Sequence, residues 1–472
     1  MSGDLAAIEL ADAALRLTEG RVTSVALTEA CLARAEAWQA SRNCFIRIDA
    51  GRALEAARER DRELKRGDRR GPLHGIPLAH KDMFYRKGEV STGGSKILRD
   101  QIATTTATVL RRLDEAGAVE IGALNMSEFA AGPTGHNIHY GHCRNAFDRA
   151  RVAGGSSSGS AVAVAARVAF GALGSDTGAS IRLPAAYNGV VGLKPTYGRV
   201  SRHGAMPRSW SLDHVGPFAR TARDCALLLQ VIAGQDQDDA TTSSQPVPDY
   251  AAALGADRLS GLTIGIADHG VVTLEPEVAA AMDESVRTLE RTGAKIVRVV
   301  LPDLAPAFRV GETIIKSEAA AMHRQWLETR PTDYSNSVRF RIEGGLYLPA
   351  ADYIDALRLR GSMTAQFLAE TMAGIDLLHI PATSHLPPTI EESDMEQTDS
   401  ETLLTLFSRL TQFMRPFNFF GLPAVSVPCG FSAGGLPLAY QLVGHPFAEA
   451  TLLRAVDAYQ RVTDFHRIAP TL

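Results

Sequence analysis

The fold is decided by a stretch that begins Gly154-Gly155-Ser156-Ser157-Ser158-Gly159-Ser160 and ends Gly174-Ser175-Asp176-Thr177-Gly178-Ala179-Ser180-Ile181-Arg182. The residues between these two turns, 161–172, are mostly small and apolar. This pattern predicts a buried helix that leads into a short strand. Hydroxyl groups and free backbone N–H groups are therefore concentrated at the two turns.

The first turn has two other interpretations. A Gly/Ser run can be a flexible linker, but this run leads directly into an apolar helix that has to be buried. A phosphate-binding loop carries a Lys after its glycines, and no Lys follows here. A nest of backbone N–H groups can hold an oxyanion as readily as a phosphate, so oxyanion binding stays open at either turn.

A serine nucleophile needs a base, and Lys81 is the candidate. It follows the apolar, strand-like run 75–79. A free lysine has a pKa of about 10.4, so it acts as a base near neutral pH only where burial or nearby cations lower that pKa. Buried lysine is rare without a partner or a role. The alternative is a lysine whose ammonium group reaches the surface from the end of the strand.

The rest of the chain alternates between strand and helix patterns. Helical spacing over 108–116 leads into the strand-like run 118–121, and residues 262–266 alternate as a strand. A helix is then expected to start at Pro276, and 295–300 returns to strand. This β-α-β rhythm predicts an α/β fold.

The 472 residues, 45% hydrophobic and 22% charged, would allow about three average domains or one large one. We expect one domain with three parts. Residues 1–65 are predicted to be helices that wrap the domain, 66–240 its core, and 241–472 the remainder of the core. A variable helical region at about 303–415 is the expected substrate cover. The polar segment 234–250 is interpreted as a surface loop.

Composition limits the partners and the compartment. Lys and Arg number 49 against 53 Asp and Glu, so the chain lacks the basic excess typical of nucleic-acid binders. The cysteines are scattered and form no C-x-x-C, which is typical of a reducing cytoplasm: Cys31, Cys44, Cys143, Cys225 and Cys429. No signal peptide and no membrane-spanning window is recognised. We therefore predict a cytoplasmic protein with no nucleic-acid or membrane partner.

These motifs together resemble the amidase signature family. The likeness begins at Lys81-Asp82 and the two turns, and continues through 189–200 and 211–217. It returns at 418–424 and 435–442, so it spans most of the chain. The resemblance implies the amidase signature fold, a single α/β/α domain in which helices cover a central, mixed, twisted sheet.

The resemblance also implies a Ser-cisSer-Lys triad. Ser180 aligns with the nucleophile, Lys81 with the base, and Ser156 with the bridging serine, whose peptide bond is cis in that family. Neutral Lys81 is expected to take a proton from Ser156, which takes one from Ser180. Ser180 then attacks the amide carbonyl and water hydrolyses the acyl-enzyme, so no metal or organic cofactor is expected.

Around the nucleophile, the resemblance assigns an oxyanion hole to the backbone N–H groups of Thr177, Gly178, Ala179 and Ser180. Three further residues are expected to support this loop. Asp176 and Arg182 should pair and brace it, and Ser157 is a candidate hydrogen-bond donor. The sequence departs from the family at Ala179, where Gly is usual. A Cβ is tolerated there only at negative φ, and it narrows the space beside the nucleophile.

A histidine-rich segment lies before the first turn. His136, His139 and His142 have H-x-x-H-x-x-H spacing, which could place metal ligands on one face of a helix. Neighbouring glycines disfavour a helix here, so no metal site is predicted. Because loops beside a site often carry specificity, His136, His139 and Cys143 are assigned to the substrate pocket.

The variable helical region offers further pocket candidates. Tyr353 and Arg358 are assigned to the substrate pocket, although a solvated helix face is the alternative. One of the arginines in this region, Arg339, Arg341 or Arg358, could bind a substrate carboxylate through its forked guanidinium group.

We therefore predict hydrolysis of a small, linear carboxamide to a carboxylate and ammonia or an amine, by a homodimer. One alternative is the A subunit of a tRNA-dependent amidotransferase. Residues 189–243 look much like that subunit, but Ala179 and the residues after Glu318-Ala319 depart from its usual pattern. The other alternative is a non-catalytic binding protein on an amidase fold, which the intact triad residues disfavour.

Overall fold

The computed structural model describes residues 4–255, 259–267, 272–394, 396 and 400–472. In this part of the chain, an 11-stranded sheet has the order β1-β3-β2-β4-β6-β5-β10-β11-β9-β7-β8. Its strands are β1 (Phe45–Ile48), β2 (Pro77–Lys81), β3 (Val119–Leu124), β4 (Ala172–Asp176), β5 (Val191–Lys194), β6 (His214–Ala219), β7 (Thr263–Ala267), β8 (Lys295–Val299), β9 (Leu377–Pro381), β10 (Ala424–Phe431) and β11 (Pro437–Gly444). The sheet is mixed: β2 runs parallel to β3 and β4, and β7 runs parallel to β8 and β9. The remaining neighbours are antiparallel.

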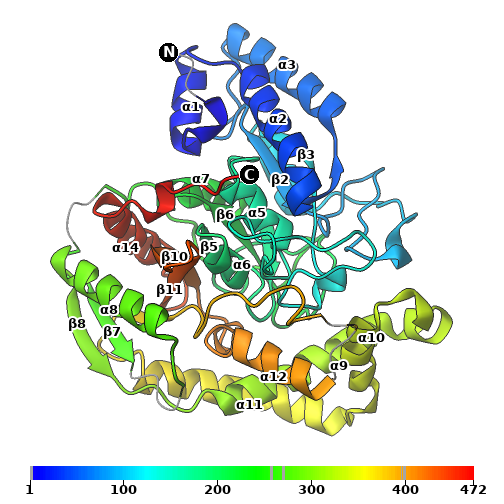
Figure 1. Ribbon diagram of the computed structural model, residues 1–472, viewed down its shortest axis with the longest axis vertical. Helices are drawn as coiled ribbons and strands as arrows, with labels where there is room; N and C mark the ends of the chain where they lie inside the picture. The colour runs from blue at the N-terminus through cyan, green and yellow to red at the C-terminus, as the bar shows by residue number, and fades with distance from the viewer. Residues whose placement is uncertain (1–3, 256–258, 268–271, 395, 397–399) are drawn as a thin grey trace.

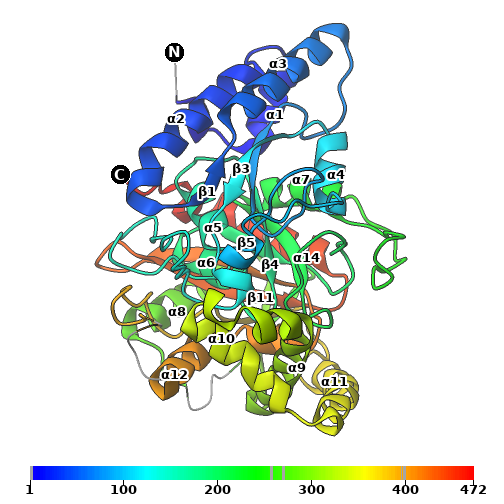
Figure 2. The same cartoon turned by 90° about the vertical axis from the view of Figure 1, so that its right-hand side faces the viewer.

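Helices flank this sheet (Figures 1 and 2). They are α1 (Leu10–Thr18), α2 (Ser24–Arg42), α3 (Ala50–Arg66), α4 (Thr108–Glu115), α5 (Ser158–Ala165), α6 (Arg182–Tyr187), α7 (Ala222–Ile232), α8 (Pro276–Arg291), α9 (Ala305–Thr329), α10 (Asn336–Glu343), α11 (Ala350–Glu370), α12 (Ser400–Thr411), α13 (Arg415–Phe419) and α14 (Glu449–Arg461). Helices α1 to α3 lie at one end of the molecule, and α9 to α12 lie at the other. The predicted α/β/α fold with a mixed central sheet is confirmed.

Most elements expected from the sequence are present. The helix predicted over 108–116 is α4, and the strand expected at 262–266 is β7. Two strands lie where helices were expected. β1 lies inside the range 1–65 that was expected to be entirely helical, and β9 lies inside the helical region 303–415. Both are short and largely apolar, and periodicity alone cannot separate such a strand from a buried helical segment. No strand was specifically predicted at β5, β6, β10 or β11.

The N-terminal helices pack on the body of the molecule through both hydrogen bonds and apolar contacts. The backbone N–H of Ala11 donates to Asp224 Oδ1 at 3.0 Å, and Arg220 Nη1 donates to the carbonyl of Ala7 at 2.8 Å. Apolar residues of α1 and α2, such as Leu10 and Leu27, belong to the same buried cluster as the sheet. The expected wrap is therefore part of one continuous core.

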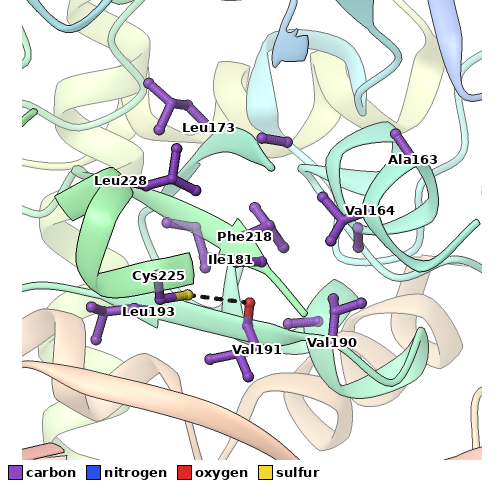
Figure 3. Close-up of a cluster of buried hydrophobic side chains, with 14 of the residues drawn as sticks. Ala163, Val164, Leu173, Ile181, Val190, Val191, Leu193, Phe218, Cys225 and Leu228 are labelled. Carbon is purple, nitrogen blue, oxygen red and sulfur yellow. Dashed lines mark hydrogen bonds between the residues drawn. The ribbon is translucent and has the colours of Figure 1, made fainter. Parts of the chain in front are cut away.

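The core beneath the two glycine-rich turns is tightly closed (Figure 3). Side chains from α5, β4, β5 and α7, and from the residues just before α6 and β5, surround Phe218 of β6, and all are buried: Ala163, Val164, Leu173, Ile181, Val190, Val191, Leu193, Cys225 and Leu228. Small residues on α5 let this helix approach the sheet closely. The two turns are consequently held at fixed positions at the ends of packed elements.

Candidate active site

Lys81 is the last residue of β2 and is 1% exposed. Its Nζ lies 2.7 Å from Ser156 Oγ and 2.9 Å from Ser175 Oγ, within hydrogen-bond distance of both. Burial lowers the pKa of Lys81 to about 7, although the nearby Asp176 and Asp213 carboxylates oppose this shift. The lysine therefore does not reach the surface, and its neutral form is accessible near neutral pH.

The first turn places Ser156 against this lysine. The Gly155–Ser156 peptide bond is cis, as the family resemblance implied. Gly154 has a φ of +74°, a conformation that favours glycine. A Cβ on Gly155 would lie 2.6 Å from the carbonyl oxygen of Gly132, which leaves no room for a side chain. The chain then enters α5, so the turn is anchored by a buried helix.

The second turn presents Ser180 at the end of β4 and the start of α6. Ser180 is 9% exposed, and its carbonyl accepts a hydrogen bond from the backbone N–H of Ser157 at 3.3 Å. Among the residues described, the backbone N–H groups of Gly178, Ala179 and Ser180 donate no hydrogen bond. Ala179 is not among the residues with positive φ, so its Cβ fits the turn. Three backbone donors thus remain available beside the Ser180 hydroxyl.

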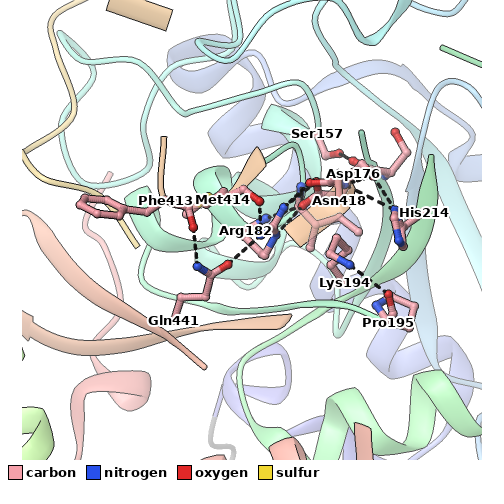
Figure 4. A network of polar contacts seen from close by, with 12 residues as sticks. Ser157, Asp176, Arg182, Lys194, Pro195, His214, Phe413, Met414, Asn418 and Gln441 are labelled. Atoms are coloured by element: carbon pink, nitrogen blue, oxygen red, sulfur yellow. Dashed lines mark hydrogen bonds and ion pairs between the residues drawn. The ribbon is translucent and has the colours of Figure 1, made fainter. Parts of the chain in front are cut away.

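A buried ion pair braces this turn (Figure 4). Arg182 Nε and Nη2 each donate to the Asp176 carboxylate at 3.0 Å, and both side chains are fully buried. Burial alone would raise the pKa of Asp176, but the Arg182 guanidinium holds it well below its usual range. Arg182 also donates to Gln441 Oε1 at 2.7 Å and to Asn418 Oδ1. The expected pairing of Asp176 with Arg182 is present, and it joins the turn to β11 and α13.

Ser157 and Thr177 attach the turn to its surroundings. Ser157 Oγ donates to the carbonyl of Ser175 at 3.1 Å and accepts from the backbone N–H of Ser175 at 3.3 Å. It thereby fixes Ser175, whose hydroxyl is the second hydrogen-bond partner of Lys81. Thr177 Oγ1 donates to Asp213 Oδ1 at 2.6 Å. The other oxygen of Asp213 accepts from the backbone N–H groups of Arg208 and Ser209 at 2.8 and 2.9 Å. The position of Arg208 is therefore tied to the turn.

A cavity of about 520 Å³, here called the central cavity, opens onto Ser180. Four cationic side chains, Arg208, Arg341, Arg415 and Lys316, line it against two carboxylates, those of Glu312 and Glu343. Burial lowers the pKa of Arg208 to about 10 and that of Arg341 to about 9. Arg208 Nη1 and Arg415 Nε are buried and have no hydrogen-bond partner among the described residues. This cation-rich wall suits an anionic ligand group.

The histidine-rich segment lies elsewhere. His136 and His142 line a separate cavity of about 180 Å³, where their rings are 4.6 Å apart. His139 Nε2 lies 2.9 Å from Glu128 Oε1, and Cys143 is buried with a raised thiol pKa because of that burial. Hence His136, His139 and Cys143, which we expected in the substrate pocket, are not among the residues that line the central cavity. The loop instead contacts neighbouring segments, since His136 Nε2 lies 3.1 Å from the carbonyl oxygen of Ile390.

Tyr353 and Arg358 do not line the central cavity either. Tyr353 donates to the buried carboxylate of Glu318 at 2.9 Å, and Arg358 pairs with Asp355 on an exposed face of α11. The solvated face that was weighed as the alternative is thus where Arg358 lies. Of the arginines proposed to bind a carboxylate, Arg341 is the one that reaches the central cavity.

In the described part of the chain, no group of three or more His, Cys, Asp or Glu side chains is arranged to hold a metal ion. No described helix is both long and apolar enough to cross a membrane.

Sequence reasoning missed several residues of the site: Ser175, Arg208, Glu312, Lys316 and Arg415. Signals for three of them existed. Ser175 lies inside the quoted second turn, Arg208 lies shortly before the motif 211–217, and Arg415 lies shortly before the motif at 418–424. Glu312 and Lys316 reach the cavity from one face of α9, and no local pattern marks that face as part of a site.

Comparison with known proteins places the chain in a family. A sequence profile of the Amidase family matches residues 26–453. The A subunit of glutamyl-tRNA(Gln) amidotransferase from Chloroflexus aggregans is 42% identical, over 97% of this chain and 96% of that protein. Peptide amidase from Stenotrophomonas maltophilia is 31% identical and superposes with a TM-score of 0.81, covering 98% of this chain and 97% of its own. The structure of 6-aminohexanoate cyclic dimer hydrolase, 27% identical, has a TM-score of 0.89 and covers 99% of each chain. The chain belongs to the amidase signature family, whose reaction is hydrolysis of the amide C–N bond.

Proposed function

We propose that this protein hydrolyses a small carboxamide through an acyl-enzyme on Ser180. Neutral Lys81 takes a proton from Ser156, and Ser156 takes one from Ser180 as its Oγ attacks the amide carbonyl. The C–N bond breaks, the nitrogen leaves with the relayed proton, and water then releases the carboxylate. The observation that carries this proposal is the buried side-chain nitrogen of Lys81, whose Nζ lies 2.7 Å from Ser156 Oγ.

The oxyanion hole is proposed at the N–H groups of Thr177, Gly178, Ala179 and Ser180. Support comes from the free donors of this turn and from the Asp176–Arg182 ion pair that fixes it. Donors that are already oriented stabilise the charge that develops on the carbonyl oxygen, and one such donor is worth about 10²- to 10³-fold in rate.

The substrate is proposed to carry a carboxylate or a similar anionic group. Arg208, Arg341, Arg415 and Lys316 line the cavity, and their four positive charges exceed the two carboxylates of Glu312 and Glu343. Two of these guanidinium groups have buried nitrogens without a partner among the described residues. An anionic ligand would satisfy them, and charge-assisted hydrogen bonds to carboxylates are the stronger kind.

The test is ammonia release from a panel of primary amides by the purified chain. Ser180→Ala is expected to abolish turnover, whereas Ser362→Ala, on the exposed face of α11, should leave it unchanged. Glutaramate should be preferred over hexanamide, which has a similar length and no charge. Full turnover by Ser180→Ala would exclude the proposed nucleophile.

A second candidate is the A subunit of a tRNA-dependent amidotransferase. It is favoured by the near full-length similarity to proteins of that name at 42% and 41% identity. Robust ammonia release by the chain alone, with no dependence on added partner subunits or tRNA, would count against this candidate. Activity that appears only with such partners would count for it and against an independent amidase.

A further inference from the structure

A second and larger cavity adjoins the central one. It has a volume of about 890 Å³ and is called here the outer cavity. Much of its wall is apolar, contributed by the segment before α8, the segment before α9, α9 itself, and α12 with the residues after it: Val272, Leu301, Leu304, Phe308, Phe407 and Phe413. Asp303 and Arg309 also line it. None of these six apolar residues lines the central cavity. The proposed hydrolysis uses none of them.

The two cavities meet at a shared neck. Five residues line both: Glu312, Lys316, Arg341, Leu404 and Arg415. Glu312 is paired with Lys316 at 3.3 Å, which leaves the two arginines as surplus positive charge. The neck is close to the nucleophile, because a Cβ on Gly178 would lie 3.2 Å from Arg415 Nε. A molecule at Ser180 can therefore extend through a cationic neck into the outer cavity.

Two aromatic rings of the apolar wall contact the arginines of the neck. The Arg415 guanidinium lies 4.0 Å from the centre of the Phe308 ring, and that of Arg341 lies 4.9 Å from the centre of the Phe407 ring. These stacking contacts hold the guanidinium groups at the boundary. Along the path from Ser180, the wall therefore changes from hydrogen-bond donors to cations and then to apolar side chains.

We infer that the substrate is an amphiphilic amide whose anionic group sits at the neck and whose alkyl or aryl arm occupies the outer cavity. This inference rests on the proposed amide hydrolysis, and it adds that the substrate carries an apolar arm. The order of groups along the path fixes the order in the ligand: amide, anion, apolar arm. Transfer of such an arm from water into an apolar cavity lowers its free energy in proportion to the buried area.

The probes are glutaramate and 2-benzylglutaramate, which differ only by a benzyl arm on the carbon that bears the carboxylate. Both enantiomers of the benzyl compound are assayed. We expect a kcat/KM at least about tenfold higher for one benzyl enantiomer, mostly through a lower KM. Equal values, or a preference for glutaramate over both enantiomers, would overturn the inference and leave the amidase proposal standing.

Two variants on the exposed side of α12 test whether the arm binds in the outer cavity. Ser408 lines the outer cavity and Thr405 lines neither cavity. Ser408→Trp should narrow the outer cavity and lower the benzyl preference, with a smaller effect on glutaramate hydrolysis, and Thr405→Trp should change neither. Retention of the full preference in Ser408→Trp would contradict the assignment to the outer cavity.

Product binding separates this inference from the proposed function. Calorimetry with the Ser180→Ala variant measures the affinities of glutarate and 2-benzylglutarate without turnover. We expect the benzylated diacid to bind at least about tenfold more tightly. Equal affinities would overturn the arm assignment, whatever the enzyme hydrolyses. A failure of both amides to react, with the affinity difference present, would instead contradict amide hydrolysis.

Discussion

At the scale of single residues, the chemistry depends on the burial of Lys81. A lysine at the end of an exposed strand would stay protonated at neutral pH and could not accept a proton. Here burial brings its pKa to about 7, and two hydroxyl oxygens lie at hydrogen-bond distance from the amine in place of water.

The shifted pKa of Lys81 also makes the free energy of unfolding depend on pH. Because its pKa is lower in the folded state, the unfolded chain binds more protons above about pH 7, so this contribution to the unfolding free energy rises with pH up to about 10.4.

The first prediction concerns the pH dependence of catalysis. Lys81 accepts a proton only when neutral, so kcat/KM for glutaramate should rise about tenfold per pH unit below pH 7 and reach a plateau above it. Initial rates of ammonia release between about pH 5.5 and 9 measure this profile. The enzyme should be returned to pH 8 after each incubation, as a control for acid unfolding. A profile that is flat or falls through pH 7 would contradict Lys81 as the base.

Single residues could be predicted where they lie in a recognisable motif. The residues proposed as the triad do, so Lys81, Ser156 and Ser180 could be proposed from the sequence. Arg208 and Arg415 lie outside the quoted motifs, and only the fold brings them to one cavity. Ala179 departs from the family pattern, yet it does not adopt positive φ and is accommodated as a buried lining residue of the central cavity.

At the scale of elements, the second turn is positioned by a network that ties β4 and α6 to α13 and β11. Arg182 is the centre of this network, with Asp176, Asn418 and Gln441 as partners (Figure 4). The ends of two strands and two short helices are thereby fixed relative to the turn. An element that moved would expose the buried charges, so the network resists displacement.

The second prediction is that Arg182→Met lowers the unfolding free energy by about 3 to 5 kcal/mol, because it leaves the Asp176 carboxylate buried without its partner. Urea unfolding followed by circular dichroism measures the change. Arg358→Met is the matched control, since its pair with Asp355 is exposed, and it should change stability by less than about 1 kcal/mol. Equal effects of the two substitutions would contradict the bracing role of Arg182.

The strands β1 and β9 could not be predicted, because their sequences resemble the helical segments around them. β1 has four residues and pairs only with β3, so its sequence carries too few alternating positions to be distinguished from the helices around it. β9 is buried between β11 and β7, and its continuous apolar run looks like part of the helical region. In contrast, α8 was predicted because Pro276 marks its start and apolar residues repeat at helical spacing.

At the scale of the whole molecule, the sheet draws strands from all three ranges expected from the sequence, 1–65, 66–240 and 241–472. The N-terminal range supplies β1 and buried side chains of the main core. The helices α9 to α12 stand at the opposite end, and α9, α10 and α12 contribute residues to the walls of both cavities. The cavities thus lie toward the end of the molecule opposite the N-terminal helices.

The third prediction is that deletion of residues 1–66 abolishes cooperative unfolding and activity, because it removes β1 and exposes the core beneath α1 to α3. A thermal melt by circular dichroism and an ammonia-release assay check this together. Deletion of residues 4–7 alone, which removes only a short 3-10 segment, serves as the control and should retain a cooperative transition. A stable, active 67–472 fragment would show that the wrap is an accessory and not part of the fold.

The expected homodimer and the cytoplasmic location stay predictions. Sedimentation velocity on the purified chain checks the first, and a single species of twice the chain mass of 50.6 kDa is the expected result. A monomer at micromolar concentration would contradict it.

The most direct test of the central claim is covalent labelling with a fluorophosphonate, followed by peptide mass spectrometry. An activated serine attacks this reagent, whereas an ordinary hydroxyl does not. We predict one adduct, located on Ser180, that is absent from Ser180→Ala and forms at least about 10²-fold more slowly in Lys81→Ala. Ser362→Ala, on the exposed face of α11, which contributes no residue to either cavity, should label at the normal rate. An adduct on another residue, or equal labelling of Ser180→Ala, would contradict Ser180 as the nucleophile.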